Sequence, residues 1–237
     1  MFSKEMVIKQ KNRAIVLLSG GIDSTTCLGI AKEMGFDVYA LTVDYGQRHR
    51  KELDSAAKIA QIMGVEEHRI MKLDLRSLGG SSLTSDLSVP KEREISSISE
   101  IPSTYVPARN TLFLSLALAQ GEVLGAFDIF IGANQIDFSG YPDCREEYLK
   151  AFEAMANLAL KATVEGKNKV KIHAPLLHMT KAEIIKKASS LGIDLSLTHS
   201  CYDPSPDGKA CGLCDSCIIR KKGFIEANIP DPTTYIN

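Results

Sequence analysis

The chain has 237 residues, of which 44% are hydrophobic, enough for one large α/β domain with a substantial core. Its 28 basic and 29 acidic residues give a formal net charge of -1, unlike a protein that grips a nucleic-acid backbone. The N-terminal stretch is polar, and no apolar run approaches the roughly 20 residues that span a bilayer. We therefore expect a cytoplasmic protein of one domain, residues 1–237, without nucleic-acid or membrane partners.

Apolar runs and helical patterns alternate along the chain. The runs predict four strands, at residues 14–19, 38–44, 68–73 and 127–132. Helical patterns occupy residues 24–34, 52–63, 111–124, 146–161 and 181–191. Residues 76–105, rich in serine, glycine and charge, are expected to form a lid or binding loop. This order predicts an α/β fold with a Rossmann-like, doubly wound, mostly parallel sheet that binds ligands at the carboxyl ends of its strands.

The first predicted strand ends in the hexapeptide SGGIDS, residues 19–24. Gly20 and Gly21 allow the backbone to approach an anion closely, and the amides that open the following helix point towards it. No lysine follows Gly21 before Lys32, so the loop lacks the lysine that reaches the β- and γ-phosphates in the common phosphate loop. Such a loop suits a leaving pyrophosphate with Mg²⁺ nearby, which favours attack at the α-phosphate of ATP. The alternative is an ordinary turn in which Asp23 or Ser24 caps the helix.

Four of the six cysteines crowd into the C-terminal region. Cys201, Cys211, Cys214 and Cys217 supply enough soft ligands for one closed tetrahedral zinc site, which we expect to be structural. The predicted zinc-binding element spans residues 199–222. The alternative is four free thiols. His199 is expected to support this site without ligating the metal.

The two remaining cysteines are expected to be structural. Cys27 falls on the apolar side of the first predicted helix and is expected in the core. Cys144 has no histidine nearby in sequence, which favours a structural thiol over a nucleophile.

Several further segments carry a resemblance to a known family. They are DYGQRHRKEL at 44–53, YVPARNTLFLS at 105–115, SGYPDCR at 139–145 and HSCYDPSPDGKACGLCDSC at 199–217. With SGGIDST at 19–25, they make essentially the whole chain resemble the 7-cyano-7-deazaguanine synthases of the pyrophosphate-loop ATPase superfamily. The resemblance implies an ATP-dependent ligase of queuosine biosynthesis. Such a ligase converts 7-carboxy-7-deazaguanine and ammonia to 7-cyano-7-deazaguanine (preQ0) through adenylated acid and amide intermediates. A homodimer is implied as well.

The motifs and the resemblance together give an expected set of site residues. ATP is expected to contact Leu18, Ser19, Gly20, Gly21, Ile22, Asp23, Ser24, Thr25, Thr26, Cys27, Leu28, Asp44, Tyr45, Gln47 and Arg109. The residues expected to be catalytic are Asp23, Ser24 and Lys181. Lys181 resembles the lysine that contacts phosphate in related enzymes, and an ordinary surface lysine is the alternative.

The turn SGYPDCR is expected to bind the deazapurine. Tyr141 would stack on the ring, Asp143 would accept hydrogens from a guanine-type edge, and Arg145 would pair with a carboxylate.

Two other functions fit parts of the sequence. A related pyrophosphate-loop enzyme that modifies tRNA or another target would share the first loop, but the near-zero net charge opposes a tRNA substrate. A non-catalytic nucleotide-binding zinc protein would share the loop and the four cysteines. Substrate-dependent exchange between ATP and pyrophosphate distinguishes these possibilities.

Overall fold

The computed structural model describes residues 12–92, 101–134 and 141–236. Five strands form one sheet in the order β3-β2-β1-β4-β5, and every neighbouring pair is parallel. The strands are β1 (Arg13–Leu17), β2 (Asp37–Asp44), β3 (Glu67–Lys72), β4 (Asp128–Phe130) and β5 (Lys171–His173). The predicted parallel α/β sheet is confirmed, and β5 joins it as an edge strand that the sequence pattern did not reveal.

Helices connect the strands and continue beyond the last one. They are α1 (Ile22–Glu33), α2 (Lys51–Ile62), α3 (Arg109–Leu124), α4 (Glu146–Ala159), α5 (Lys161–Val164), α6 (Lys181–Ser190) and α7 (Asp215–Ala227). Short 3₁₀ turns lie at η1 (Arg76–Leu78), η3 (Pro142–Cys144) and η4 (Leu195–Leu197). The helix predicted over residues 146–161 ends at Ala159, and α7 was not predicted. None of the helices in the described ranges is both long and apolar enough to cross a bilayer.

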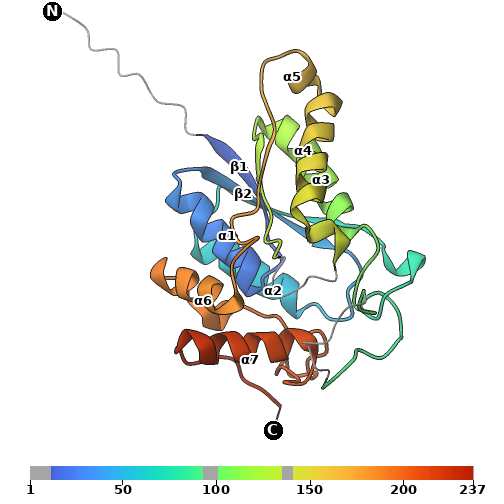
Figure 1. Ribbon diagram of the computed structural model, residues 1–237, viewed down its shortest axis with the longest axis vertical. Coiled ribbons are helices and arrows are strands. Elements are labelled where there is room, and N and C mark those ends of the chain that lie inside the picture. Colours follow the sequence, from blue (N-terminus) through green and yellow to red (C-terminus); the bar gives the residue numbers. More distant parts are fainter. Residues whose placement is uncertain (1–11, 93–100, 135–140, 237) are drawn as a thin grey trace, which may run out of the picture.

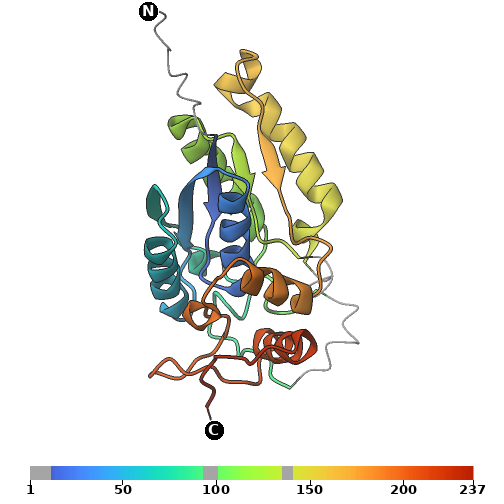
Figure 2. The same ribbon diagram turned by 90° about the vertical axis from the view of Figure 1, so that its left-hand side faces the viewer.

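The sheet is covered by helices on both faces (Figure 2). Alternate residues of β1 point to opposite faces, as the pleat of a strand requires. Ile15 and Leu17 pack in a cluster with residues of α3 and α4. Ala14 and Val16 pack in a second cluster with residues of α1, α2, α6 and α7. The two cores hold β1 in the middle of the fold and fix the position of the loop that follows it.

Helices α6 and α7 pack together at the end of the molecule that holds the C-terminus (Figure 1). Strand β1 starts at the opposite end and runs towards them. Gly223 of α7 permits this packing, because a Cβ there would lie 2.4 Å from Cγ of Lys181 in α6. The C-terminal helices therefore close the region beyond the carboxyl ends of the strands, where a doubly wound sheet binds its ligands.

The described parts of the segment predicted as a lid are packed against the rest of the protein. Leu83 and Val89 are buried in the same cluster as β1 and α3. The Glu92 N–H donates to the carbonyl oxygen of Leu213, 2.9 Å away, in the cysteine-rich region. These parts of the segment join the sheet core to the C-terminal region.

Candidate functional site

The loop between β1 and α1 is pressed against the first turn of α2. Gly20 has a φ of +87°, in the left-handed region that favours glycine. A Cβ at this position would lie 2.4 Å from the carbonyl oxygen of Glu52 and 2.8 Å from the amide nitrogen of Ala56, both backbone atoms. Glycine is therefore required at position 20 by the backbone conformation and by the closeness of α2.

Helix α1 begins without a side-chain cap among the described residues. Its N-cap is Gly21, so the alternative of a cap from Asp23 or Ser24 is wrong. The first intrahelical hydrogen bond runs from the Thr25 N–H to the Gly21 carbonyl oxygen (3.1 Å). The amides ahead of it and the helix dipole make this helix start suitable for an anion.

Two serine hydroxyls lie at the entrance of this loop. The Oγ atoms of Ser19 and Ser24 are 3.0 Å apart, and Ser24 Oγ donates to the Gly21 carbonyl oxygen (3.1 Å). Thr25, Thr26 and Cys27 also donate to backbone carbonyl groups, but unlike Ser19 and Ser24 they do not line the pocket at the carboxyl ends of the strands. Of the residues predicted from the hydroxyl-rich helix start, Ser19 and Ser24 face the ligand side and the later ones support the helix.

Lys181 and Asp23 form a close ion pair at the edge of the loop. The Nζ atom of Lys181 lies 2.6 Å and 2.8 Å from the two carboxylate oxygens of Asp23. The side chains are 9% and 22% exposed, so the pair is mostly shielded from water. Lys181 is placed by the N-terminus of α6, where Thr180 and Glu183 form a capping box. The alternative of a surface lysine is therefore wrong, and the two predicted residues meet across 158 positions of sequence.

A pocket lies at the carboxyl ends of β1, β2 and β4. The predicted site residues in its lining are Leu18, Ser19, Gly21, Ile22, Asp23, Ser24, Tyr45, Gln47, Arg109, Tyr141 and Lys181. Those outside the lining are Gly20, Thr25, Thr26, Cys27, Leu28, Asp44, Asp143 and Arg145. The structure thus brings the phosphate-type loop, Lys181 and two residues of the SGYPDCR turn, Tyr141 and Cys144, to a single cavity.

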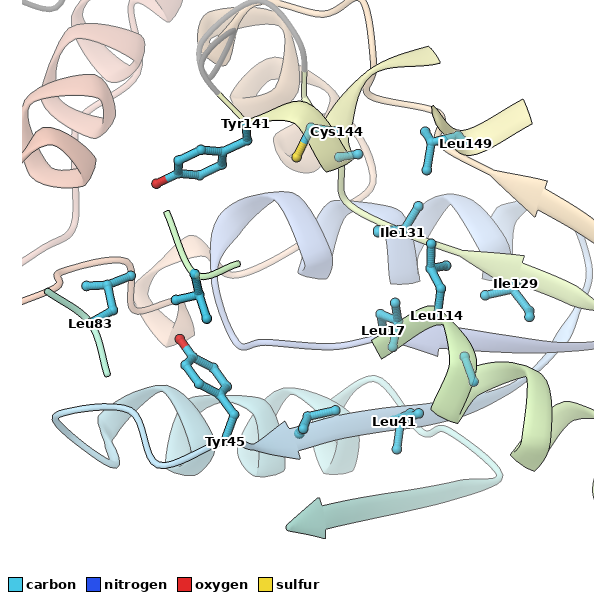
Figure 3. Packing of buried hydrophobic residues seen from close by; sticks show 14 of the residues in the cluster. Leu17, Leu41, Tyr45, Leu83, Leu114, Ile129, Ile131, Tyr141, Cys144 and Leu149 are labelled. Carbon is cyan, nitrogen blue, oxygen red and sulfur yellow. The ribbon is translucent and has the colours of Figure 1, made fainter. Parts of the chain in front are cut away.

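Aromatic side chains surround Arg109 in this pocket. Tyr45 follows β2, and Tyr141 and Cys144 lie across the same space from it (Figure 3). Burial and the carboxylate of Glu52 raise the pKa of Tyr45 to about 12. Burial disfavours the charge of Arg109, but the neighbouring phenols, first that of Tyr45, raise the pKa of Arg109 above its usual value. This part of the pocket offers a guanidinium and ring faces, a combination suited to a planar anionic ligand.

Asp143 serves as a backbone acceptor in the structure. Its Oδ2 atom accepts the N–H of Asn110 in the first turn of α3 (3.0 Å), and Asn110 Nδ2 donates to the Asp143 carbonyl oxygen (3.1 Å). Arg145 is exposed at the N-cap of α4. Ser139 and Gly140 of the same predicted turn lie outside the described residues. Direct contacts from Asp143 and Arg145 to a ligand therefore stay predictions, and of the three residues predicted to bind the deazapurine, Tyr141 is the one that lines the pocket.

The thiol of Cys144 also lines the pocket and accepts a hydrogen bond from Asn110 Nδ2 (3.3 Å). Burial, and then the charge of Asp143, raise the pKa of Cys144 to about 11. The thiol is thus protonated at neutral pH, which agrees with the expected structural role.

Several residues of the lining were not predicted as site residues. Glu52 belongs to the motif DYGQRHRKEL, and its burial raises its pKa to about 7. His199, Ser200 and Tyr202 come from the segment that precedes and follows Cys201. The backbone N–H of His199 donates to the Gly20 carbonyl oxygen (2.9 Å). These residues lie within or beside the recognised motifs, which is the one feature of the sequence that could have indicated them. Only the fold shows that their side chains face the pocket.

The four C-terminal cysteines form a compact cluster. The Sγ atoms of Cys201, Cys211, Cys214 and Cys217 all lie within 4.8 Å of one another, and all four residues are buried. Backbone N–H groups donate to two of the sulfurs, two to Cys201 and two to Cys211. Four buried sulfurs this close together, two of which accept backbone hydrogen bonds, fit a thiolate site for a tetrahedral metal ion, with no place for His199 as a ligand. The cysteine cluster therefore has the composition and geometry to hold a metal ion.

The chain is similar to known proteins over nearly its whole length. A family model described as queuosine biosynthesis protein QueC matches residues 13–228. A protein of Desulfatibacillum aliphaticivorans named 7-cyano-7-deazaguanine synthase is 62% identical over 96% of this chain and 98% of its own length. One of the same name from Geobacter metallireducens is 61% identical over 94% of this chain and 93% of its own.

Among solved structures, the NMN synthetase of Francisella tularensis aligns with a TM-score of 0.48 at 13% identity, over 92% of this chain and 85% of that one. That degree of likeness carries no information about function. The family match spans nearly all of the described residues. The chain belongs to the QueC family of queuosine biosynthesis proteins.

Proposed function

We propose that this chain, a 7-cyano-7-deazaguanine synthase by its family, makes that nitrile from 7-carboxy-7-deazaguanine, ammonia and ATP. A carboxylate is a poor electrophile until one of its oxygens becomes part of an acyl phosphate. Attack of the carboxylate on the α-phosphate gives an adenylated acid and pyrophosphate, and ammonia then converts this acid to the amide. A second activation, at the amide oxygen, allows dehydration to the nitrile. One nucleotide site serves both steps.

The observation that carries this proposal is the loop at Gly20 and Gly21, which faces the same cavity as Lys181 and Tyr141. We assign the uncapped amides of α1 and the hydroxyls of Ser19 and Ser24 to the β- and γ-phosphates. We assign the other residues predicted to contact ATP to packing of the loop or to contacts with the nucleoside.

We assign Lys181 to the charge that develops at the α-phosphate. Mg²⁺, when bound with ATP, neutralises phosphate charge, and the carboxylate of Asp23 is the ligand that this chain offers to it. Binding of ATP and Mg²⁺ would replace the Lys181–Asp23 ion pair with one contact from each side chain to the ligand.

The deazapurine is assigned to the aromatic part of the pocket. Tyr141 and Tyr202 offer ring faces, and Arg109 offers charge to the carboxylate before it is activated. Asp143 holds the start of α3 and thereby positions Arg109. We also propose that Arg145 contacts the deazapurine substrate when it is bound.

The metal of the cysteine cluster is proposed to be zinc. Four thiolates suit Zn²⁺, and since they complete a tetrahedron the ion supports folding and takes no part in the reaction. We further propose one domain over residues 1–237 that includes the zinc element at 199–222, and a cytoplasmic homodimer. The near-neutral charge and the family resemblance support this assignment.

Exchange of label between pyrophosphate and ATP tests the proposal directly. Exchange should require 7-carboxy-7-deazaguanine, and turnover with ammonium should give AMP, pyrophosphate and the nitrile, identified by mass spectrometry. Asp23→Asn should abolish the exchange, whereas Asp54→Asn, at an exposed position of α2, should not. Formation of ADP and orthophosphate as the nucleotide products would refute attack at the α-phosphate.

A further inference from the structure

Glu52 is a carboxylate in the pocket that the steps above do not use. Among the described residues that line the pocket, Asp23 and Glu52 are the acidic ones, and Asp23 is held by Lys181. In the described part of the chain, the ion-pair partner of Glu52 is Nε2 of His49, 3.8 Å from Oε1, and burial lowers the pKa of this imidazole, which favours its neutral form. The Glu52 side chain is 18% exposed. Glu52 therefore places a mostly buried and weakly paired carboxylate inside the cavity.

The position of Glu52 relates it to the phosphate-type loop. Its own carbonyl oxygen is the atom that a Cβ on Gly20 would touch, so the first turn of α2 lies directly on the loop. The charge of Arg109, which lines the same pocket, acts on Glu52 and opposes the rise of its pKa. Glu52 thus shares one pocket with Ser19 and Gly21 of the loop assigned to ATP and with Arg109, the side chain assigned to the substrate carboxylate.

A second group with unused hydrogen-bonding capacity lies in the same corner. His199 lines the pocket and is 8% exposed, and its Nε2 atom is buried with no hydrogen-bond partner in the described part of the chain. The ring of His199 meets that of His49 edge to face, with 5.4 Å between centroids. The backbone of His199 is fixed to Gly20. A carboxylate and a buried ring nitrogen make this corner suited to a small ligand with N–H groups.

Three other ionisable groups of the pocket, Cys144, Tyr45 and Lys181, are poorly suited to remove a proton near neutral pH. Burial raises the pKa of Cys144 to about 11 and that of Tyr45 to about 12, so both are protonated. Lys181 is a cation that donates to Asp23. Burial raises the pKa of Glu52 to about 7, which leaves a large share of this carboxylate able to accept a proton and later to release it to water.

We propose that Glu52 binds the ammonium ion beside the adenylated acid and acts as the general base that turns it into ammonia. This inference rests on the function proposed above. Glu52 takes one proton from ammonium, and the freed nitrogen lone pair forms a bond to the carbonyl carbon of the acyl adenylate. The bond from that carbon to the phosphate oxygen breaks, and AMP leaves with the bonding electrons. The second proton that the nitrogen loses goes to the phosphate of AMP, so the amide forms without a further reactant.

The test separates the ligase step from the adenylation step. Glu52→Gln keeps the shape of the side chain but removes its basicity, and Glu52→Asp keeps the carboxylate. Asp54→Asn, on the exposed side of the same helix, is the matched control. Each protein is assayed for acid-dependent exchange of pyrophosphate into ATP, for amide formation with ammonium, and for hydroxamate formation with hydroxylamine. Hydroxylamine is uncharged at neutral pH and needs no base before it attacks.

In Glu52→Gln, kcat/KM for ammonium should fall about 100-fold, the usual scale for loss of a general base. Exchange and hydroxylamine turnover should stay within about threefold of the unsubstituted protein. Glu52→Asp should recover part of the ammonium activity, and the control should retain all of it.

Two results would overturn the assignment. Equal losses with ammonium and hydroxylamine would mean that Glu52 does not act on the proton. A raised KM for the deazapurine acid in the exchange assay would mean that Glu52 contacts that substrate instead. Absence of acid-dependent exchange in the unsubstituted protein would refute the proposed function itself, which is a separate outcome.

Discussion

Substitution of Gly20 by alanine tests how the phosphate-type loop is held against α2. The left-handed φ of +87° costs a residue with a Cβ about 1–2 kcal/mol. The new Cβ would also lie 2.4 Å and 2.8 Å from backbone atoms of Glu52 and Ala56, which a side-chain rotation cannot relieve. Overpacking of this kind costs about 1–3 kcal/mol. The free energy of unfolding should therefore fall by about 2–5 kcal/mol, a large part of the stability of a typical domain.

Gly35→Ala is the matched control for this experiment. Gly35 has a φ of +84°, but a Cβ there would meet no atom within 4 Å, so only the conformational cost of about 1–2 kcal/mol applies. Urea denaturation measures both losses, and ATP binding without the second substrate shows whether the loop has moved. Gly20→Ala should be the less stable variant and should bind ATP more weakly, while Gly35→Ala should bind it normally. Equal stability and equal ATP affinity in the two variants would refute the contact between the loop and α2.

Three further predictions concern the Lys181–Asp23 ion pair, the metal and the carboxylate of Glu52. Lys181→Met should remove the ion-pair partner of Asp23, lower the free energy of unfolding by about 1–3 kcal/mol and abolish pyrophosphate exchange. Lys187→Met removes a more exposed ion pair and should change the free energy of unfolding by less than about 0.5 kcal/mol. Cys214→Ser should lower bound zinc and the melting temperature together, and unchanged zinc by elemental analysis would contradict a four-cysteine site. The pKa of Glu52 is raised from 4.5 to about 7, so the folded state binds this proton more tightly than the unfolded state and its contribution to stability is lost as pH rises through that range. The gain in melting temperature of Glu52→Gln over the unsubstituted protein should therefore grow from about pH 5 to about pH 8, and a gain independent of pH would argue against the raised pKa.

The sequence predicted most of the sheet because its central strands are buried apolar runs between helical patterns. Strand β5 was not predicted because it has only three residues. Two of them, Lys171 and His173, are polar, so the strand contains no apolar run. Helix α7 was hidden because a cysteine ligand and the stretch from Arg220 to Gly223 interrupt its apolar pattern. Such elements acquire their structure from tertiary contacts more than from local pattern.

The sequence indicated the local geometry best where one motif fixes the backbone. The loop at residues 19–24 and the four cysteines depend on glycine conformation and ligand spacing, both of which are local properties. Asp143 is different, because only the folded chain shows that its carboxylate accepts the N–H of Asn110. Glu52 and Tyr202 likewise sit in recognised segments, but the direction of their side chains depends on how α2 and the cysteine-rich loop pack.

The cysteine cluster and the pocket share one short piece of chain. Cys201 is a member of the cluster, while His199 and Tyr202 beside it line the pocket. The His199 N–H holds the Gly20 carbonyl oxygen, and the Asp203 N–H donates to the sulfur of Cys201 (3.3 Å). A metal ion that holds this sulfur in place therefore also holds His199 and Tyr202 in the pocket wall, together with the hydrogen bond from His199 to Gly20 of the phosphate-type loop. Because metal binding and local folding are coupled in such clusters, removal of the metal should weaken ATP binding at temperatures where the parallel sheet is still folded. Far-UV circular dichroism reports whether the sheet of the chelator-treated protein is still folded, and titration of the same sample with ATP gives its affinity. Unaltered ATP affinity in protein shown to be metal-free would mean that the metal does not support the pocket.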